Sequence, residues 1–337
     1  MEKFNIKNRR YLGNKYKLLS FIEKVINDNC KDIKIVADIF SGTGSFSTLF
    51  KNKILITNDI LYSNYLCNLA WFGVDKVRFD LIEKIVMRIN KYNIIEKNYM
   101  TDNFSNTYFD KKGCSKINYA RSYIEELYNE KNINQRERAT LITSLIYAMD
   151  RVANTCGHYD AYIKDNKTFD DIVLKMPDID NENNKKNKCY NIDSNELVKQ
   201  IKPDLIYIDP PYNSRQYCDA YHLLENIAKW EKPTVYGIAK KMNRDNLKSK
   251  YCTNEAETAF KELIYNIDSK YIVLSYNSTA NKLNERSNAR ISDECICDVL
   301  KEKGKLKIFS SDYKAFTTGK TKKINNKERL FLCEVDK

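Results

Sequence analysis

The run Ile33 to Phe40, with the sequence IKIVADIF, constrains the fold more than any other feature of this chain. A short, continuous apolar run of this kind is typical of a strand that is covered on both faces in a parallel sheet. It leads into Ser41-Gly42-Thr43-Gly44, after which we expect a helix to start at Ser45. A second apolar run, Ile54 to Thr57, ends at Asn58-Asp59. The order strand, glycine turn, helix and strand predicts one βαβ unit.

Further strands and helices follow along the chain. The apolar runs that predict strands are Lys188 to Ile192, Asp204 to Ile208, Tyr271 to Ser275, Leu306 to Phe309 and Leu330 to Val335. Helical spacing predicts helices at Leu18 to Cys30, Arg136 to Val152 and Phe260 to Ile267. The segment from about Cys67 to Met176 has a helical pattern, and the polar segment Asp178 to Lys188 predicts a surface loop. We therefore expect an α/β sheet domain, residues 1–66 and 188–337, interrupted by a mainly helical insertion, residues 67–187, and closed by an antiparallel hairpin.

The glycine turn and a later acid together predict a nucleoside site. Gly42 and Gly44 at the carboxyl end of the first strand let the backbone approach a ligand closely. Asp59 ends the second strand, 21 residues after Asp38. A carboxylate at that place can accept both hydroxyls of a ribose. The turn alone would be only a tight connection, and the absent three-glycine fingerprint argues against a nicotinamide or flavin enzyme.

Asp209-Pro210-Pro211-Tyr212 follows the predicted strand that ends at Ile208. Two prolines fix the backbone and remove two N–H donors, so the chain leaves the strand in one stiff shape. The ring of Tyr212 can stack on a base, while the carboxylate of Asp209 and a proline carbonyl accept the two protons of an exocyclic amine. In isolation the same four residues would fit a proline turn at a sheet edge. After a buried strand and beside a nucleoside site, they predict a clamp for an amino-bearing base.

Composition narrows the partners. The formal net charge of +12 fits a polyanion such as nucleic acid, although a sequence rich in Lys, Asn, Ile and Tyr also fits A/T-rich coding. The ten cysteines show no metal-like spacing and there are only two histidines, so we expect no metal site. No apolar run is long enough to cross a bilayer and the polar start lacks a signal core. We expect a soluble, cytoplasmic protein with reduced thiols.

The four residues from Asp209 are the signature of amino-group methyltransferases, and Asp in the first position is typical of the adenine-specific branch. Over most of its length the chain resembles the Dam-like, alpha-class DNA adenine methyltransferases. The stretch Asp209 to Tyr217, DPPYNSRQY, is similar to the subset that includes the FokI methylase. The long insertion between Asp59 and Asp193 gives the motif order of the alpha class. The resemblance implies a Rossmann-like, seven-stranded, mostly parallel sheet with S-adenosylmethionine as cofactor.

The resemblance also implies roles for single residues. Arg10 to Lys15 resembles the family's N-terminal cofactor motif, and Asp38 to Gly44 its glycine motif. Asp59 matches its ribose-binding acid, and Asn191-Ile192-Asp193 resembles the motif whose acid contacts the cofactor adenine. The cofactor-binding residues expected on this basis are Tyr11, Lys15, Asp38, Phe40, Gly42, Gly44, Asp59 and Asp193.

The chemistry that the resemblance implies is methylation of the N6 amine of an adenine in double-stranded DNA. The catalytic residues would be Asp209, Pro210, Pro211 and Tyr212, acting on a base flipped out of the duplex. The insertion of such enzymes recognises the target sequence. Double-stranded DNA is the expected partner, and a cognate restriction endonuclease is compatible with it. The recognition sequence and the oligomeric state stay open.

Five residues outside these motifs are candidate DNA contacts: Asn154, His158, Tyr159, Arg215 and Tyr217. The first three lie in a turn, residues 154–162, that ends the helix predicted to stop at Val152. A glycine-stopped helix with aromatic packing explains that turn equally well, and for His222 a structural role is favoured. The basic segments Lys240 to Lys250 and Lys320 to Lys327 fit phosphate contacts or a solvated surface.

Three other functions fit parts of the pattern. Methylation of cytosine N4 is disfavoured because such enzymes usually carry Ser where Asp209 stands. Methylation of adenine in RNA is disfavoured by the large insertion and the motif order. A catalytically silent nucleic-acid-binding protein would be expected to lose Asp209, Tyr212 or the glycines, and all of them are present.

Overall fold

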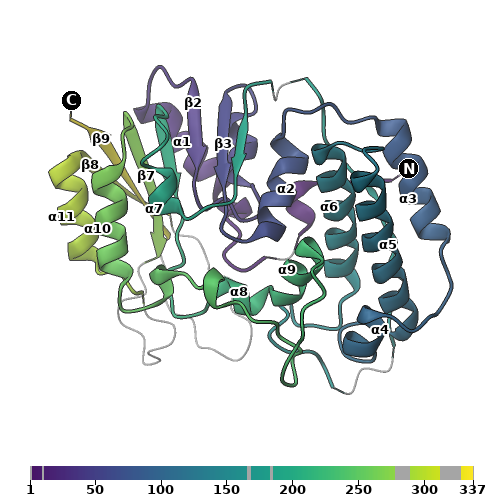
Figure 1. Cartoon of the computed structure of the whole chain (residues 1–337). Coiled ribbons are helices and arrows are strands. Elements are labelled where there is room, and N and C mark those ends of the chain that lie inside the picture. Colours follow the sequence, from purple (N-terminus) through teal and green to yellow (C-terminus); the bar gives the residue numbers. More distant parts are fainter. Residues whose placement is uncertain are drawn as a thin grey trace.

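A seven-stranded sheet in the order β5-β3-β2-β6-β7-β9-β8 forms the centre of the computed structural model (Figure 1). The structure describes residues 2–9, 11–164, 168–182, 185–277, 289–311 and 328–336. The strands are β2 Ile35–Asp38, β3 Ile54–Asn58, β5 Lys188–Tyr190, β6 Leu205–Ile208, β7 Tyr271–Asn277, β8 Gly304–Ser311 and β9 Glu328–Val335. The first five strands of the sheet order are parallel, and β9 runs antiparallel to both β7 and β8. The predicted α/β fold with its C-terminal antiparallel hairpin is confirmed.

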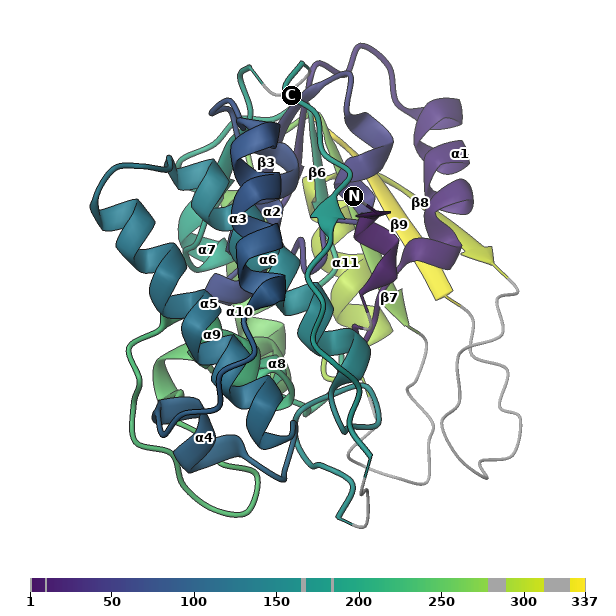
Figure 2. The same cartoon turned by 90° about the vertical axis from the view of Figure 1, so that its right-hand side faces the viewer.

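The apolar strand residues alternate between the two faces of this sheet. Val36 and Leu205 belong to a core cluster that also contains the buried face of α1, Leu19–Asn29. Ala37 and Ile206 belong to a second cluster, formed with α10, Ala256–Asn266, and α11, Asp293–Lys303. Figures 1 and 2 show α1 on one side of the sheet and the other two helices on the opposite side. Because both faces are covered, the strands read as continuous apolar runs.

One of the remaining helices, α7, packs against α10, and the others gather beside the β3 and β5 edge or beneath the sheet in Figure 1. They are α2 Tyr62–Phe72, α3 Phe79–Lys91, α4 Tyr99–Phe104, α5 Lys111–Asn129, α6 Gln135–Val152, α7 Ser194–Leu197, α8 Tyr217–Ala220 and α9 His222–Lys229. A two-stranded sheet pairs β1, Lys3–Phe4, with β4, Met176–Pro177. Single 3-10 turns span η1 Ile6–Asn8, η2 Tyr16–Leu18, η3 Phe46–Phe50, η4 Asp245–Leu247 and η5 Lys250–Cys252. No helix in these described ranges has the length and hydropathy to cross a membrane.

Helix α6 is more deeply buried than its apolar face suggests. Every side chain from Arg136 to Met149 is buried, because α2, α3 and α5 all pack against it. The Asn134 side chain accepts the Glu137 N–H and so caps the first turn, and the Glu137 carboxylate accepts the Asn134 N–H in return. Glu137 also accepts three hydrogen bonds from Arg78, so the charge inside the bundle is paired. The helix is therefore the centre of the helical part of the chain.

Four local predictions need correction or fall outside the described residues. The helix expected from Ser45 is a 3-10 helix, Phe46–Phe50, and β2 is shorter than the apolar run Ile33 to Phe40. The polar segment before β5 is not simply a surface loop, because Asn187 is buried, accepts from the Leu55 N–H and donates to the Phe72 carbonyl. The basic segment 320–327 lies outside the described residues. The division at residues 67 and 187 stays a prediction.

Candidate active site

A cavity of about 350 Å³ opens at the carboxyl edge of the parallel strands, a size that suits a small-molecule ligand. The register pairs Asp38 with Tyr207, which places Asp38 and Asp209 at adjacent strand ends. The predicted residues that line the cavity are Tyr11, Lys15, Asp38, Phe40, Gly42, Asp59, Asp193, Asp209, Pro211 and Tyr217. Gly44, Pro210 and Tyr212 do not line it. Residues from distant parts of the chain thus meet at one edge of the sheet.

The glycine turn needs both of its glycines. Gly42 has a φ of +51° and Gly44 a φ of +83°, in the left-handed region that disfavours other residues. A Cβ on Gly44 would lie 2.6 Å from Asn68 Oδ1 and 2.9 Å from the Phe72 ring, and one on Gly42 would lie 3.2 Å from the Tyr11 ring. Gly42 therefore forms the cavity wall, whereas Gly44 lets α2 pack against the turn.

Asp59 is fixed by two backbone donors. Its carboxylate accepts the N–H of Gly42 at 2.8 Å and that of Leu61 at 2.9 Å. Burial raises the pKa of Asp59 to about 6, while these hydrogen bonds act to lower it. The carboxylate is mostly ionised at neutral pH and still has lone pairs for a ligand donor.

Asp38 has a polar atom without a protein partner. Its side chain is buried, and Oδ2 accepts from the Ser47 hydroxyl at 3.0 Å. Oδ1 is buried without a hydrogen-bond partner among the described residues. Burial raises the pKa of Asp38 to about 8, and the nearby charges of Asp209 and Asp59 act in the same direction. Such an atom in the wall of a cavity is a place for a ligand donor.

Asp209 forms an ion pair with the N-terminal arm. Lys15 Nζ lies 3.3 Å from Asp209 Oδ1, and the lysine side chain is 8% exposed. The arm is held by Tyr221, whose hydroxyl accepts the Leu12 N–H, and by Tyr217, whose hydroxyl donates to the Leu12 carbonyl. The N-terminal motif predicts a cofactor contact for Lys15, and the structure places its ammonium group on the carboxylate of Asp209.

Tyr11 anchors the arm from the other side. Its ring stacks on Tyr221 with centroids 4.5 Å apart, and its hydroxyl accepts from Asn64 at 2.9 Å. The guanidinium of Arg9 lies 5.1 Å from the Tyr11 ring centroid and is bound to Asp150 of α6. Arg10 lies outside the described residues. The arm thus connects the cavity to the helical part of the chain.

Two further predicted residues, Asp193 and Phe40, line the cavity, and a third, Tyr212, lies beside it. Asp193 caps α7 by accepting the Asn195 N–H at 2.8 Å. Phe40 meets Tyr251 edge to face at 5.2 Å. Tyr212 packs partly buried against the second core cluster, and its carbonyl accepts the Arg290 N–H. Its ring therefore lies beside the cavity rather than in its wall.

Sequence reasoning missed the wall formed by residues 246–251. This segment lines the cavity and is held by Gln216, whose amide exchanges hydrogen bonds with the backbone of Ser249 at 2.8 and 3.1 Å. Tyr251 donates its hydroxyl proton to Asn195 Oδ1 at 2.9 Å. No motif or spacing marks these residues, which were noticed only as part of a basic segment.

The candidate DNA contacts fall into two groups. Asn154 and Tyr159 are buried, and their side chains bind within the protein: Asn154 donates to two carbonyls, and Tyr159 donates to Asp150. Tyr217 faces the cavity. The burial of Asn154 and Tyr159 argues against direct DNA contact by their side chains, whereas a contact of Tyr217 with a ligand in the cavity stays a prediction.

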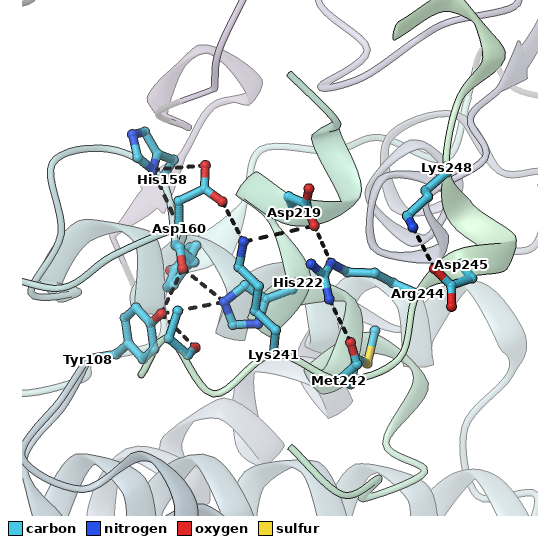
Figure 3. A network of polar contacts seen from close by, with 12 residues as sticks. Tyr108, His158, Asp160, Asp219, His222, Lys241, Met242, Arg244, Asp245 and Lys248 are labelled. Atoms are coloured by element: carbon cyan, nitrogen blue, oxygen red, sulfur yellow. Dashed lines mark hydrogen bonds and ion pairs between the residues drawn. The ribbon is translucent and has the colours of Figure 1, made fainter. Parts of the chain in front are cut away.

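His158 and Arg215 remain accessible. His222 is buried, and its Nε2 lies 2.8 Å from the Tyr159 carbonyl. Burial lowers the pKa of His222 to about 4, so the ring is neutral and its role is structural. Figure 3 shows how it sits under a polar network around Asp160 and Lys241. Of the candidates, His158 and Arg215 are accessible at the surface, and Tyr217 is accessible from the cavity.

Comparison with known proteins gives one family. The family model for D12 class N6 adenine-specific DNA methyltransferases matches residues 11–289. The modification methylase StsI of Streptococcus sanguinis is 34% identical over 312 residues, which cover 87% of this chain and 46% of that protein. The type II methyltransferase M.FokI of Planomicrobium okeanokoites is 35% identical over 295 residues, covering 82% and 45%.

A third relative is similar over its whole length. The type II methyltransferase M.NlaIII of Neisseria lactamica is 30% identical over 328 residues, which cover 94% of this chain and 95% of that protein. The chain thus spans about half the length of the first two relatives and nearly all of the third.

Proposed function

This chain belongs to the D12 class of N6 adenine-specific DNA methyltransferases, and from that premise we propose that it methylates adenine in double-stranded DNA. The methyl group would come from S-adenosylmethionine and would be transferred to the exocyclic N6 amine of a flipped base. The observation that carries the proposal is the position of Asp209, which lines the same cavity as Asp38, Gly42 and Asp59. The residue that would bind the amine and the residues that would bind a nucleoside therefore line the same cavity.

The cavity residues suit this methyl donor. Asp59 would accept the ribose hydroxyls, Gly42 would admit close backbone approach, and the unpaired Oδ1 of Asp38 offers an acceptor for a ligand donor. Phe40 and Asp193 would face its base. When bound, the donor supplies an electrophilic methyl group on a sulfonium cation.

The residues of the catalytic loop would act on the adenine. A base inside a duplex is unreachable, so it must leave the stack, at a cost of a few kcal/mol. Tyr212 would offset part of this cost by stacking, worth roughly 1 to 3 kcal/mol. Asp209 and the Pro210 carbonyl would hold the amine, and the carboxylate would stabilise positive charge that develops on its nitrogen. Lys15 would keep this carboxylate in place through their 3.3 Å contact.

The wider assignment also rests on the family. The helical residues 67–187 would recognise the target sequence. Relatives named as modification methylases and type II methyltransferases support a place in a restriction–modification system, with a cognate endonuclease as partner and a cytoplasmic location.

Transfer of labelled methyl groups tests the proposal directly. The protein would be incubated with labelled S-adenosylmethionine and unmethylated double-stranded DNA, single-stranded DNA or RNA, and the modified nucleoside identified by mass spectrometry. We expect N6-methyladenine in the duplex. Label that appears only in RNA, or only on cytosine, would overturn the proposal.

A further inference from the structure

The residues between α9 and the cavity wall form a tight turn, 236–241, at its outer end. Tyr236 and Lys241 exchange both backbone hydrogen bonds, at 2.8 and 2.9 Å. Gly237 has a φ of +68°, and a Cβ built there would meet no atom within 4 Å. The turn therefore projects into open space; Figure 1 shows the green loop below α9.

Two large apolar side chains stand on this turn. Tyr236 is 64% exposed and Ile238 is 72% exposed, which are the highest values for large hydrophobic residues in the described part of the chain. A single exposed hydrophobic residue is ordinary. Tyr236 and Ile238, which are separated only by Gly237, form an apolar tip on the projecting turn, and the protein itself does not cover this tip.

The base of the turn is held from both sides (Figure 3). Lys241 Nζ lies 2.8 Å from Asp160 Oδ1 and 3.8 Å from Asp219 Oδ1, and Arg244 also binds Asp219. On the helical side, the Tyr108 hydroxyl lies 2.9 Å from the Ala239 carbonyl. The tip is thus presented in a fixed shape, so it would lose little conformational entropy on binding.

The charge around the tip selects a polyanion. Residues 231–250 contain six basic side chains, Lys232, Lys240, Lys241, Arg244, Lys248 and Lys250, against two acids, Glu231 and Asp245. Lys241, Arg244 and Lys248 are paired within the protein. Within the described ranges, Lys240 on the turn and Lys250 at the cavity have no ion pair. The free positive charge therefore lies beside the apolar tip and along the path to the cavity.

The same segment joins the tip to the catalytic face. It continues from Arg244 into the cavity wall at residues 246–251, and Gln216, seven residues after Asp209, clamps that wall. A partner that reaches the catalytic loop from outside would therefore meet the turn as well.

We propose that the turn 236–241 is a DNA-inserting wedge: Tyr236 and Ile238 enter the duplex beside the target adenine, and Lys240 contacts a phosphate. This inference rests on the proposed function. Apolar wedges open base steps in many DNA-bound proteins, and an aromatic ring can stack on the exposed base. The wedge fills space in the stack next to the flipped base, so it supports the same base-flipping step that stacking on Tyr212 would support.

Crosslinking and kinetics test the wedge together. Tyr236 is replaced by the photo-crosslinker p-benzoylphenylalanine and irradiated with a labelled 30-base-pair duplex of mixed sequence. Tyr265, 52% exposed on α10, receives the same group as the control. In parallel, Tyr236→Ala/Ile238→Ala is compared with Tyr265→Ala/Ile308→Ala, which removes another exposed Tyr and Ile, at 52% and 51%. All four side chains are at the surface, so folding should be preserved.

We expect a DNA crosslink from position 236 and none from 265. Tyr236→Ala/Ile238→Ala should lower kcat/KM on unmethylated plasmid DNA about tenfold or more, without changing donor affinity, whereas the control pair should stay near wild type. No crosslink to DNA at 236, unchanged kcat/KM in the double variant, or crosslinking only to a second copy of the chain would each overturn the wedge. Wild-type protein that methylates no DNA would overturn the proposed function instead, while the crosslink would still report whether the turn meets a duplex.

Discussion

Two regions of the chain line the cavity, and they are held in place by different interactions. The inner edge, formed by Asp38, the glycine turn, Asp59 and Asp209, lies at the ends of buried strands. The outer segment, residues 213–251, is held by ion pairs and hydrogen bonds to the helical part of the chain. The Gly42–Asp59 bond joins residues 17 apart in sequence, whereas the Lys241–Asp160 bond joins residues 81 apart. The inner edge is thus a local consequence of one βαβ unit, and the outer segment exists only after the whole chain has folded.

The largest expected effect is a difference in methyl-transfer rate between variants of two acids, Asp209 of the inner edge and Asp219 of the outer segment. Asp209→Asn should reduce methyl transfer about a thousandfold, because the clamp for the amine and its negative charge are lost together. Asp219→Asn removes an acid of the outer segment that binds Lys241 and Arg244, and activity should stay within about tenfold. Initial rates with labelled donor measure both, and calorimetry should find donor binding retained in Asp209→Asn. Equal losses in the two variants would mean that the catalytic loop has been misassigned.

Alanine substitutions of Gly44 and Gly157 compare the stability cost of a closely packed glycine with that of an open one. Gly44→Ala combines a left-handed φ with a Cβ 2.6 Å from Asn68, so unfolding should become easier by about 3 kcal/mol. Gly157 has a φ of +96° but nothing within 4 Å of its Cβ, so Gly157→Ala should cost only the backbone strain of about 1 to 2 kcal/mol. Chemical denaturation measures both. If Gly157→Ala were the more damaging change, the turn 154–162 would be tighter than its open surroundings indicate.

The two regions also differ in how far the sequence predicts them. The strands, the hairpin and most of the inner cavity follow from apolar runs, two glycines and acids at strand ends. The 3-10 helix after the glycine turn was not predictable, because its apolar residues fit either helix type. Residues 246–251 and the buried state of Tyr159 depend on contacts with Gln216 and Asp150, which no local pattern encodes. Lys15 was assigned to the cofactor, and only the folded chain reveals its contact with Asp209.

The pH dependence of stability should differ between the two regions, beginning with Asp38. Burial raises its pKa to about 8, so the native state holds a proton that the unfolded chain releases above about pH 4. Stability from this group is therefore full below pH 4 and is lost as the pH rises towards 8, by a total of about 6 kcal/mol. In Asp38→Asn this loss should disappear, leaving a smaller one below pH 6 from Asp59, whose pKa is about 6. Denaturation midpoints between pH 5 and 8 test it, and an unchanged slope in Asp38→Asn would contradict the buried, protonated acid.

In the outer segment, His222 should change the pH dependence of stability by a smaller amount than Asp38 and in the opposite direction. Burial lowers its pKa to about 4, so the native ring stays neutral while the unfolded chain takes up a proton below pH 6.5. Its contribution is present above pH 6.5 and is lost as the pH falls towards 4, by about 3 kcal/mol. In wild type this loss partly cancels the gain from Asp38 over the same range. His222→Gln keeps a donor for the Tyr159 carbonyl but cannot titrate, so its stability should rise more steeply on acidification than that of wild type. Parallel slopes for the two proteins would mean that the ring takes up its proton at the same pH in the native and unfolded states, which would contradict a pKa lowered by burial.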